Sequence, residues 1–600
     1  MHIKIVPLLC SLLIASPITV SADNGHRLWL SHFSATTGQD KVITRIDTNM
    51  PDDDGFRITP VGDSTLITAR RPIGLLYGRY ELLRSGNVAH ESHPQFALRM
   101  LNHWDNLNGS IERGYAGKSI FHWFHLDSTL ICQYAEANAS IGINGTVLNN
   151  VNASPKILTH KYLKEVAQIA SWLRPYGIRV YLSANFGSPK GLHQLHTADP
   201  LDPQVQDWWN KKAAEIYQLI PDFGGFLVKA NSEKQPGPAD YHRTHAEGAN
   251  MLARALKPYG GIVIWRSFVY GANHKNEDRV MQAVSEFKPL DGQFADNVTL
   301  QSKNGPLDFQ PREPYAPIFD QLHHTPQMVE LQITQEYTGQ SRQLVYLAPM
   351  WKEFFRFVSP DRLNGIAGVA NIGRDSNWCG HPFSQANWYA FGRLAWNPSL
   401  SADSIAREWL RLTFTEQPAF VDTMAKLMDG SREDCVNYMM PIGLHHIFRF
   451  DHHLGPDPGG YRAGYPREWC PVYYHNANKD SIGFDRSSHG TNAVSQYAEP
   501  YRSLYDRLDS CPDAYLLWFH RVPWTYRTHE GITVWESLQR HYDEGVKAVE
   551  GYQHTWQQMR PYVDAERWQQ VSTLLQTQLK DAQEWRKVCL TYFGQFADSK

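Results

Sequence analysis

Short apolar runs alternate with helical stretches through the middle of the chain. The runs lie at 96–104, 141–151, 178–185, 225–230, 261–268, 297–302, 328–334 and 365–372. Segments with helical periodicity separate most of them, for example 160–173 and 244–256. Eight strand-like runs alternating with helices predict a (β/α)8 barrel, because a doubly wound sheet rarely needs eight such units.

Different patterns flank this central region. Residues 56–83 show two short alternating strands with a turn at Gly62-Asp63, followed by an apolar-periodic helix, which indicates a small α/β unit. Beyond Pro398, helical periodicity returns at 404–412, 535–556 and 565–585 and predicts a mainly helical region. Residues 451–497 form a long irregular segment rich in Gly, Pro, His and Tyr, and a loop of this length usually has a function.

The prediction is therefore an α/β protein with a central TIM barrel, a small N-terminal α/β domain and a mainly α-helical C-terminal domain. The expected divisions are a signal peptide at 1–22, the short N-terminal domain at 23–92, the barrel at 93–400 and the helical domain at 401–600. Residues 24–54 look compressed or partly irregular, in a region that is short for an N-terminal domain.

The first residues have the pattern of an export signal. A basic end at Lys4 precedes an apolar run, and Val20-Ser21-Ala22 is a small-x-small cleavage pattern. We expect cleavage after Ala22 and an exported protein, either periplasmic or secreted. A lipid anchor on Cys10 is the alternative, but this cysteine lies in mid-run. No later stretch is apolar over the ~18 residues that a membrane span needs, so no membrane insertion is expected after cleavage.

Composition narrows the classes of partner. The net charge is −3, which gives no electrostatic footprint for nucleic acid. None of the seven cysteines forms a C-x-x-C pair, and the His-His pairs at His323, His445 and His452 lack metal-ligand context. Neither a metal nor a cofactor is therefore predicted. One disulfide in the last third of the chain stays open. Aromatic residues make up 12% of the chain, which suits either a large core or stacking on sugars.

Acidic residues follow three of the apolar runs. Glu233 comes after the fourth run, Asp308 after the sixth and Glu336 after the seventh. Because active sites of such barrels form at the carboxyl ends of the strands, these three side chains are expected to converge at one mouth. Glycoside hydrolysis needs such a set, with a protonated acid for the leaving oxygen and an ionised carboxylate opposite it. For any one acid alone, a structural salt bridge is the alternative.

Two cations and two apolar residues belong to the same rim. Lys229 and Arg266 could either neutralise the acids or bind an anionic group such as a uronate carboxylate, and their spacing does not separate the two interpretations. Trp104 closes the first run, where it could stack on a sugar ring, and Val151 closes the second, where it could give an apolar contact. Taken singly, each is more often a core residue.

Several long segments carry a resemblance to a known family. They read RMLNHWDNLNGSIERGYAG (99–117), GTVLNNVNA (145–153), GFLVKANSEKQPGP (225–238), GGIVIWRSFVY (260–270), KNGPLDFQPREP (303–314) and ELQITQEYTGQ (330–340). They closely resemble the bacterial xylan α-glucuronidases of glycoside hydrolase family 67. GLLYGRYELL in the preceding α/β unit and DHHLGPDP in the C-terminal region extend the resemblance.

The resemblance implies an activity. It is that of an inverting exo-hydrolase which removes (4-O-methyl)-D-glucuronic acid, linked α-1,2 to the terminal xylose of xylo-oligosaccharides. Glu233 matches the general acid, and Asp308 and Glu336 match the pair that supplies the water-activating base. The choice between these two stays open, because two carboxylates that share a water should push one pKa up.

The resemblance also implies binding roles. Lys229 and Arg266 match the residues that hold the uronate carboxylate, Trp104 the stacking wall and Val151 the contact near the 4-O-methyl group. The expected partner is a small acidic xylo-oligosaccharide, and a homodimer through the C-terminal helical domain is left open.

Two other functions compete with this one. A hexosaminidase-like barrel also follows a small α/β domain, but it uses adjacent acids at the end of the fourth strand, whereas Ser232 precedes Glu233 here. A non-catalytic glycan-binding barrel is the other alternative. It should have lost at least one acid, and all three are present.

Overall fold

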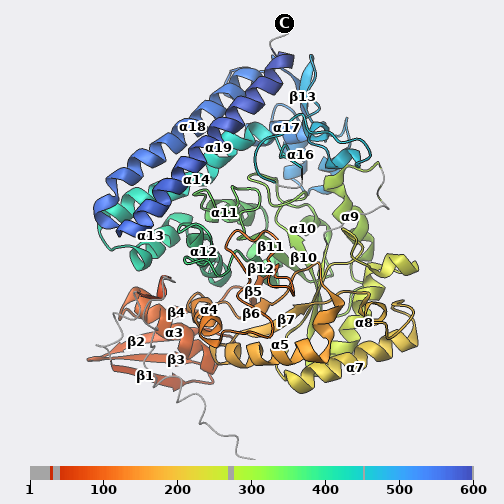
Figure 1. The fold of residues 1–600 in the computed structure, drawn as a ribbon, viewed down its shortest axis with the longest axis vertical. Helices are drawn as coiled ribbons and strands as arrows, with labels where there is room; N and C mark the ends of the chain where they lie inside the picture. The colour runs from red at the N-terminus through yellow and green to blue at the C-terminus, as the bar shows by residue number, and fades with distance from the viewer. Residues whose placement is uncertain (1–27, 32–40, 268–273, 275, 451–452, 598–600) are drawn as a thin grey trace, which may run out of the picture.

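A closed barrel of eight parallel strands forms the centre of the molecule (Figure 1). The computed structural model describes residues 28–31, 41–267, 274, 276–450 and 453–597. The barrel strands are β5 (Leu98–Asn102), β6 (Gly145–Val147), β7 (Arg179–Ser183), β8 (Gly225–Val228), β9 (Ile262–Arg266), β10 (Val298–Lys303), β11 (Gln327–Gln332) and β12 (Gly365–Val369). Pairing of β12 with β5 closes the ring. Each strand coincides with one of the eight apolar runs to within one residue, so the predicted barrel is confirmed.

Helices cover the outside of the barrel and explain why its strands are apolar throughout. All four residues of β8 are buried, as parallel strands covered on both faces should be. Helix α5 (His160–Leu173) turns Leu163, Val166 and Ile169 inward at helical spacing. Helix α8 (His245–Leu256) begins with a Thr244 cap, whose hydroxyl accepts the N–H of Glu247 while the Glu247 carboxylate accepts the N–H of Thr244.

A separate sheet precedes the barrel and lies at one end of the molecule, shown in red in Figure 1. Its strands β1 (Lys41–Ile46), β2 (Phe56–Val61), β3 (Ser64–Ala69) and β4 (His90–Ser92) are ordered β1-β3-β2-β4, and α3 (Pro72–Ser85) packs on it. The predicted hairpin and helix are confirmed. The stretch before residue 54, expected to be partly irregular, contains β1, an edge strand with largely exposed side chains that pairs in parallel with β3, and turns follow this strand.

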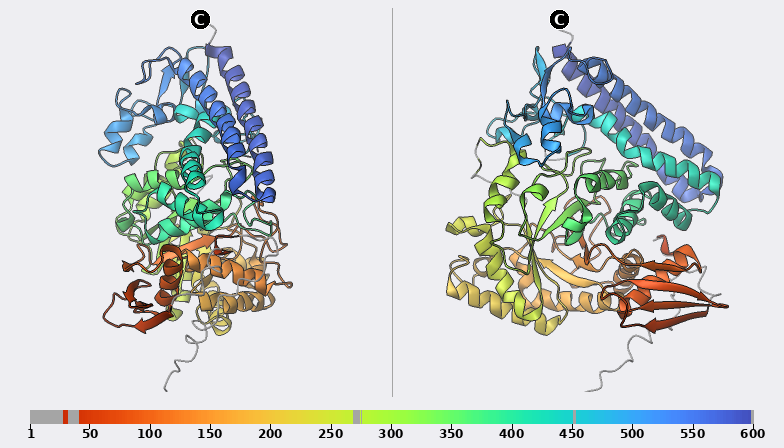
Figure 2. Two further views of the ribbon diagram at one scale, coloured as in Figure 1. Left: turned by 90° about the vertical axis from the view of Figure 1, so that its left-hand side faces the viewer. Right: turned by 180° about the vertical axis from the view of Figure 1, so that it is seen from behind.

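Long helices dominate the C-terminal third (Figure 2). They are α13 (Ala402–Thr413), α14 (Pro418–Met439), α18 (Val534–Gln558) and α19 (Ala565–Ala597). Three of them contain the helical stretches expected from the sequence, and α14 is an addition that packs against α18 and α19. The described residues between 453 and 497 are mostly irregular, as expected.

Other expectations from the sequence have different outcomes. The proposed signal peptide at 1–22 lies outside the described residues, and the divisions at 92/93 and 400/401 stay predictions. The six cysteines in the described part of the chain are all free thiols, so the disulfide left open in the last third is not formed among them. Within the same part of the chain, no helix combines the length and apolarity that crossing a membrane requires.

A buried ion pair fastens the C-terminal irregular region to the barrel. Asp278, in the connection after β9, accepts a 2.7 Å hydrogen bond from Nε of Arg486, and both side chains are fully buried. The same guanidinium donates to the carbonyl of Trp518 at 2.9 Å. An ion pair out of contact with water depends on both partners, since either one alone would be an uncompensated buried charge.

We therefore predict that Asp278→Ala destabilises the protein by about 3–5 kcal/mol, because it leaves Arg486 charged and buried. The matched control is Asp509→Ala, which breaks the exposed pair of Asp509 with Arg507 and should leave the stability almost unchanged, because solvent screens exposed pairs. Urea unfolding followed by tryptophan fluorescence compares the two midpoints. Equal midpoints for the two variants would contradict the importance of this pair.

Candidate active site

Glu336 lies in the connection that follows β11 and is surrounded by donors. Its Oε1 is 2.6 Å from Nε of Arg113 and 2.7 Å from Nδ1 of His453, and its Oε2 accepts a 2.8 Å hydrogen bond from Gln332. Arg113 belongs to the loop after β5, and His453 comes from the C-terminal region. Burial raises the pKa of the Glu336 carboxyl, but His453 and Arg113 outweigh it and hold the pKa below its ordinary value.

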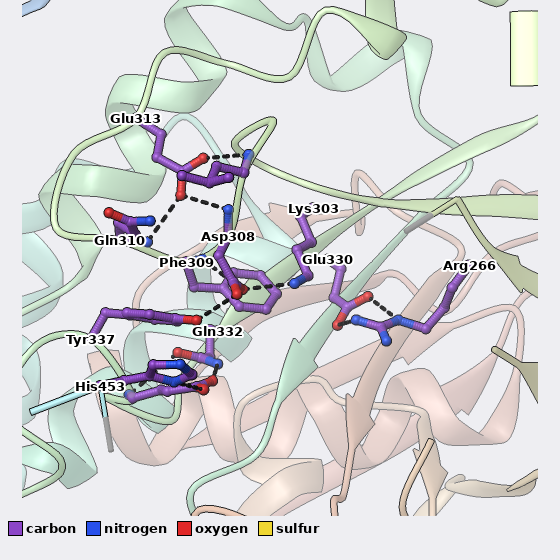
Figure 3. Close-up of polar contacts among 12 residues, drawn as sticks. Arg266, Lys303, Asp308, Phe309, Gln310, Glu313, Glu330, Gln332, Tyr337 and His453 are labelled. Atoms are coloured by element: carbon purple, nitrogen blue, oxygen red, sulfur yellow. Dashed lines mark hydrogen bonds and ion pairs between the residues drawn. The ribbon is translucent and has the colours of Figure 1, made fainter. Parts of the chain in front are cut away.

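Asp308 has its own set of partners in the loop after β10. Nζ of Lys303 lies 2.7 Å from Oδ1, and the Tyr337 hydroxyl donates to Oδ2 (Figure 3). Burial raises the pKa of Asp308. The ammonium of Lys303 and the Tyr337 hydrogen bond lower it by more than burial raises it, so the net pKa lies well below its ordinary value. Burial and the nearby carboxylate raise the pKa of Tyr337 well above its ordinary value, so its hydroxyl stays a donor.

A stacked pair of rings joins the two carboxylates. Tyr337, which bonds Asp308, stacks on His453, which bonds Glu336, with ring centroids 4.6 Å apart. The negative charge of Asp308 raises the pKa of the Glu336 carboxyl. The expected upward push is present in this effect of Asp308, but the net pKa of each carboxyl is lowered, because each has a cation of its own. Both are ionised at neutral pH.

The backbone around Asp308 is fixed by another acid that the sequence analysis missed. The Glu313 carboxylate accepts the N–H groups of Leu307 and Asp308, both at 2.8 Å, and that of Gln310 at 3.2 Å (Figure 3). The loop is closed so tightly that a Cβ on Gly305 would meet Oε2 of Glu313 at 2.4 Å. Three hydrogen bonds to one carboxylate hold the loop in a single shape.

Glu233 lies in a tight loop after β8, next to Lys229. The φ angles of Asn231, Glu233 and Lys234 are 49°, 47° and 67°, in the left-handed region that non-glycine residues rarely adopt. Lys229 donates to the Glu233 carboxylate and, at 2.8 Å, to Oδ1 of Asn152. Burial raises the pKa of Glu233, but Lys229 outweighs it and the net pKa is lowered.

Arg266 ends β9 and forms a buried bidentate pair with Glu330 of β11. Its Nε and Nη2 each lie 2.8 Å from one oxygen of Glu330, and Gln301 donates to the same carboxylate at 2.7 Å. One edge of the guanidinium is thus fixed inside the barrel. The guanidinium also interacts with the acids at the barrel mouth, since Glu233 and Asp308, after Glu330, raise the pKa of Arg266.

Trp104 and Val151 lie on neighbouring strand ends. They follow β5 and β6, whose loops are joined by a 2.8 Å hydrogen bond from the Asn150 N–H to the Asp105 carbonyl. Both side chains are buried. The indole N–H of Trp104 is buried as well and lacks a hydrogen-bond partner in the described part of the chain.

The structure brings most of the predicted residues into one charge network. The charge of Glu233 raises the pKa of Lys229 and Arg266, the charge of Asp308 raises the pKa of Glu233 and Arg266, and Glu336 is linked to Asp308. The residues that sequence analysis missed are the partners, namely Arg113, Asn152, Lys303, Glu313, Glu330, Tyr337 and His453. Glu330 had a signal, since an acid inside a buried apolar strand must be paired. Arg113 and His453 come from distant loops and had none.

Among the described residues, no group of three or more His, Cys, Asp and Glu side chains is arranged to hold a metal ion. The carboxylates are instead bound by Lys, Arg, His and Tyr. A parallel eight-stranded barrel with several acids at the carboxyl ends of its strands has the architecture of a glycoside hydrolase.

Comparison with known proteins identifies the family. The Glycosyl hydrolase family 67 middle domain matches residues 82–360 and the family 67 C-terminus matches residues 379–600, so the chain belongs to glycosyl hydrolase family 67. Alpha-glucuronidase A of Emericella nidulans is 41% identical over 584 residues, covering 90% of this chain and 68% of that protein. A probable alpha-glucuronidase A of Aspergillus niger is 39% identical over 585 residues, covering 91% and 69%.

One solved structure supports the fold. A GH138 enzyme targeting pectin rhamnogalacturonan II superposes with a TM-score of 0.52 at 14% identity, covering 92% of this chain and 64% of that one. At this identity the likeness concerns the architecture alone.

We predict that Lys303→Met makes stability depend differently on pH. In the native protein the depressed pKa of Asp308 stabilises the fold at pH values above ~3.9, the pKa of an aspartate in the unfolded chain. This stabilisation is lost as the pH falls below that value. Without Lys303, burial raises the pKa of Asp308, so the variant should be less stable by about 3 kcal/mol near neutral pH. The difference should shrink as pH falls toward ~4 and Asp308 becomes protonated in the variant.

Denaturant unfolding of both proteins between neutral pH and ~4 measures this difference. The control is Lys257→Met, which breaks the exposed pair with Asp296 and should change little at any pH. A deficit in Lys303→Met that stays constant over the whole range would mean that the pairing with Asp308 is not its cause.

Proposed function

We propose that this protein is an exo-acting, inverting α-glucuronidase. It hydrolyses the α-1,2 bond between (4-O-methyl)-D-glucuronic acid and the terminal xylose of xylo-oligosaccharides. Membership of family 67 and the names of the relatives support the activity. The observation that carries the proposal is the pair of ionised carboxylates, Asp308 and Glu336, in one charge network with Glu233 and two buried cations.

In this proposal the three acids divide the reaction. Glu233 donates a proton to the glycosidic oxygen, which leaves as the xylose hydroxyl. Either Asp308 or Glu336 accepts a proton from the water that attacks the anomeric carbon from the opposite side, so the configuration inverts. The accepted proton then returns to solvent, and one water is consumed in each turnover. The hydrogen-bonded partners of Asp308 and Glu336 support a base that is ionised before substrate arrives.

The remaining residues bind the sugars. Lys229 and Arg266 hold the uronate carboxylate, and Val151 contacts the 4-O-methyl group. Trp104 stacks on the ring from the end of β5. On the xylose side we propose the exposed aromatic residues Tyr461, Tyr465 and Trp469, which follow His453 in the C-terminal region.

We also propose that the chain is exported, to the periplasm or outside the cell, and that a homodimer forms through its C-terminal helices. The basic and apolar pattern before Ala22 supports export. The hexosaminidase-like and non-catalytic alternatives have no comparable support, because the family 67 matches cover most of the barrel and the C-terminal region.

The stereochemistry of the product tests the mechanism. We expect the mature protein to release β-configured 4-O-methylglucuronate first from aldouronic acids, because a single displacement inverts the α bond. Proton NMR followed from the first minutes distinguishes the anomers before they equilibrate. Initial release of the α anomer, or no release, would rule the proposed mechanism out.

Leaving-group dependence tests the acid. Glu233→Ala should lose about 10²–10⁴-fold in kcat on xylo-oligosaccharides, whose leaving oxygen needs a proton, and should retain activity on an aryl glucuronide with a good leaving group. Asp207→Ala, on the exposed face of helix α7 (Pro203–Leu219), is the matched control and should behave as wild type on both. Equal losses on the two substrates would remove Glu233 from the role of acid.

A further inference from the structure

The ammonium of Lys229 has two partners, Asn152 on one side and Glu233 on the other. The ammonium donates to Oδ1 of Asn152 at 2.8 Å, and the amide nitrogen of Asn152 donates to Glu112 at 3.0 Å. A carboxylate can only accept, so Glu112 fixes the amide with its oxygen toward Lys229. The Lys229 side chain is 2% exposed, whereas that of its other partner, Glu233, is 46% exposed. The lysine is therefore anchored, and Glu233 is the partner that can be displaced toward solvent.

The other cations near Glu233 are already engaged with other acids. Lys303 of β10 pairs with Asp308, and Arg266 of β9 pairs with Glu330. Lys303 also lowers the pKa of Glu233 and Asp308 raises it, but Lys229 has the larger influence. Lys234, next to Glu233 in the loop, adds a further positive charge. The contact with Lys229 is thus the main electrostatic support of the Glu233 carboxylate.

This arrangement conflicts with the role proposed for Glu233. Its lowered pKa keeps the carboxyl ionised at neutral pH, and an ionised carboxylate has no proton to donate. The uronate carboxylate of the substrate, bound at Lys229 as proposed above, would occupy the same ammonium. A carboxylate that arrives there competes directly with Glu233.

We propose that the carboxylate of the substrate displaces Glu233 from Lys229, and that Glu233 takes up one proton from solvent as the substrate binds. This inference rests on the proposed function and adds the step that loads the acid. Without Lys229, Glu233 faces a second carboxylate and is covered by the sugar, and both changes favour its neutral form. The proton that is taken up is the one later given to the glycosidic oxygen, so the cycle balances. A neutral sugar would leave Glu233 ionised, which makes the uronate a requirement for turnover and not only for affinity.

Proton uptake on binding tests the proposal directly. Titration calorimetry with D-glucuronate at pH 6, in MES and in bis-tris, gives the protons taken up from the buffer-dependent part of the heat. We expect about one proton for each glucuronate bound to the wild-type protein, because the carboxyl passes from ionised to neutral. Glu233→Gln, which keeps the side-chain shape but cannot titrate, should bind glucuronate with no uptake. Glu233→Ala serves as a second variant with the same expectation.

Lys190→Met is the matched control, since Lys190 is exposed on helix α6 (Ser188–Gly191). It should bind with the same uptake as wild type. Binding without uptake in the wild-type protein, or uptake that persists in Glu233→Gln, would overturn the inference and leave the proposed function standing. Absence of glucuronate binding together with absence of hydrolysis of aldouronic acids would overturn both.

Discussion

The cost of burying charge determines how this active site is built. A carboxylate taken out of water stays ionised only if a cation or several donors replace its hydration. Four of the acids near the barrel mouth each have a cation: Arg113 for Glu336, Lys303 for Asp308, Arg266 for Glu330 and Lys229 for Glu233. Pairing of this kind keeps Asp308 and Glu336 ionised although they repel each other.

The counter-charges explain why regions outside the barrel belong to the site. His453 reaches Glu336 from the C-terminal region, whose buried Arg486 is locked to Asp278 of the barrel. Tyr337 and His453, stacked on each other, connect the two ionised carboxylates. The C-terminal third is therefore more than a covering of helices, because one wall of the catalytic mouth depends on how it docks.

Glu233 differs from the other acids in its exposure. Its carboxylate is half-exposed and depends on one lysine, whereas Asp308 and Glu336 are buried among several partners. The difference matches the tasks proposed for these residues, since a base must be ionised before the reaction and an acid must be protonated. A partner that can be exchanged suits a group whose protonation has to change during the cycle.

The sequence by itself determined the barrel and where its acids lie. Apolar runs and helical periodicity record burial directly, and a residue that follows a barrel strand has to lie at the mouth, so Glu233, Asp308 and Glu336 could be found without coordinates. Strand β1 escaped detection because an exposed edge strand leaves little apolar pattern. Only the tertiary structure decided which cation pairs with which acid. Arg113 and His453 are brought to Glu336 by loop paths and docking, and these depend on packing between segments far apart in the chain, which no local pattern encodes.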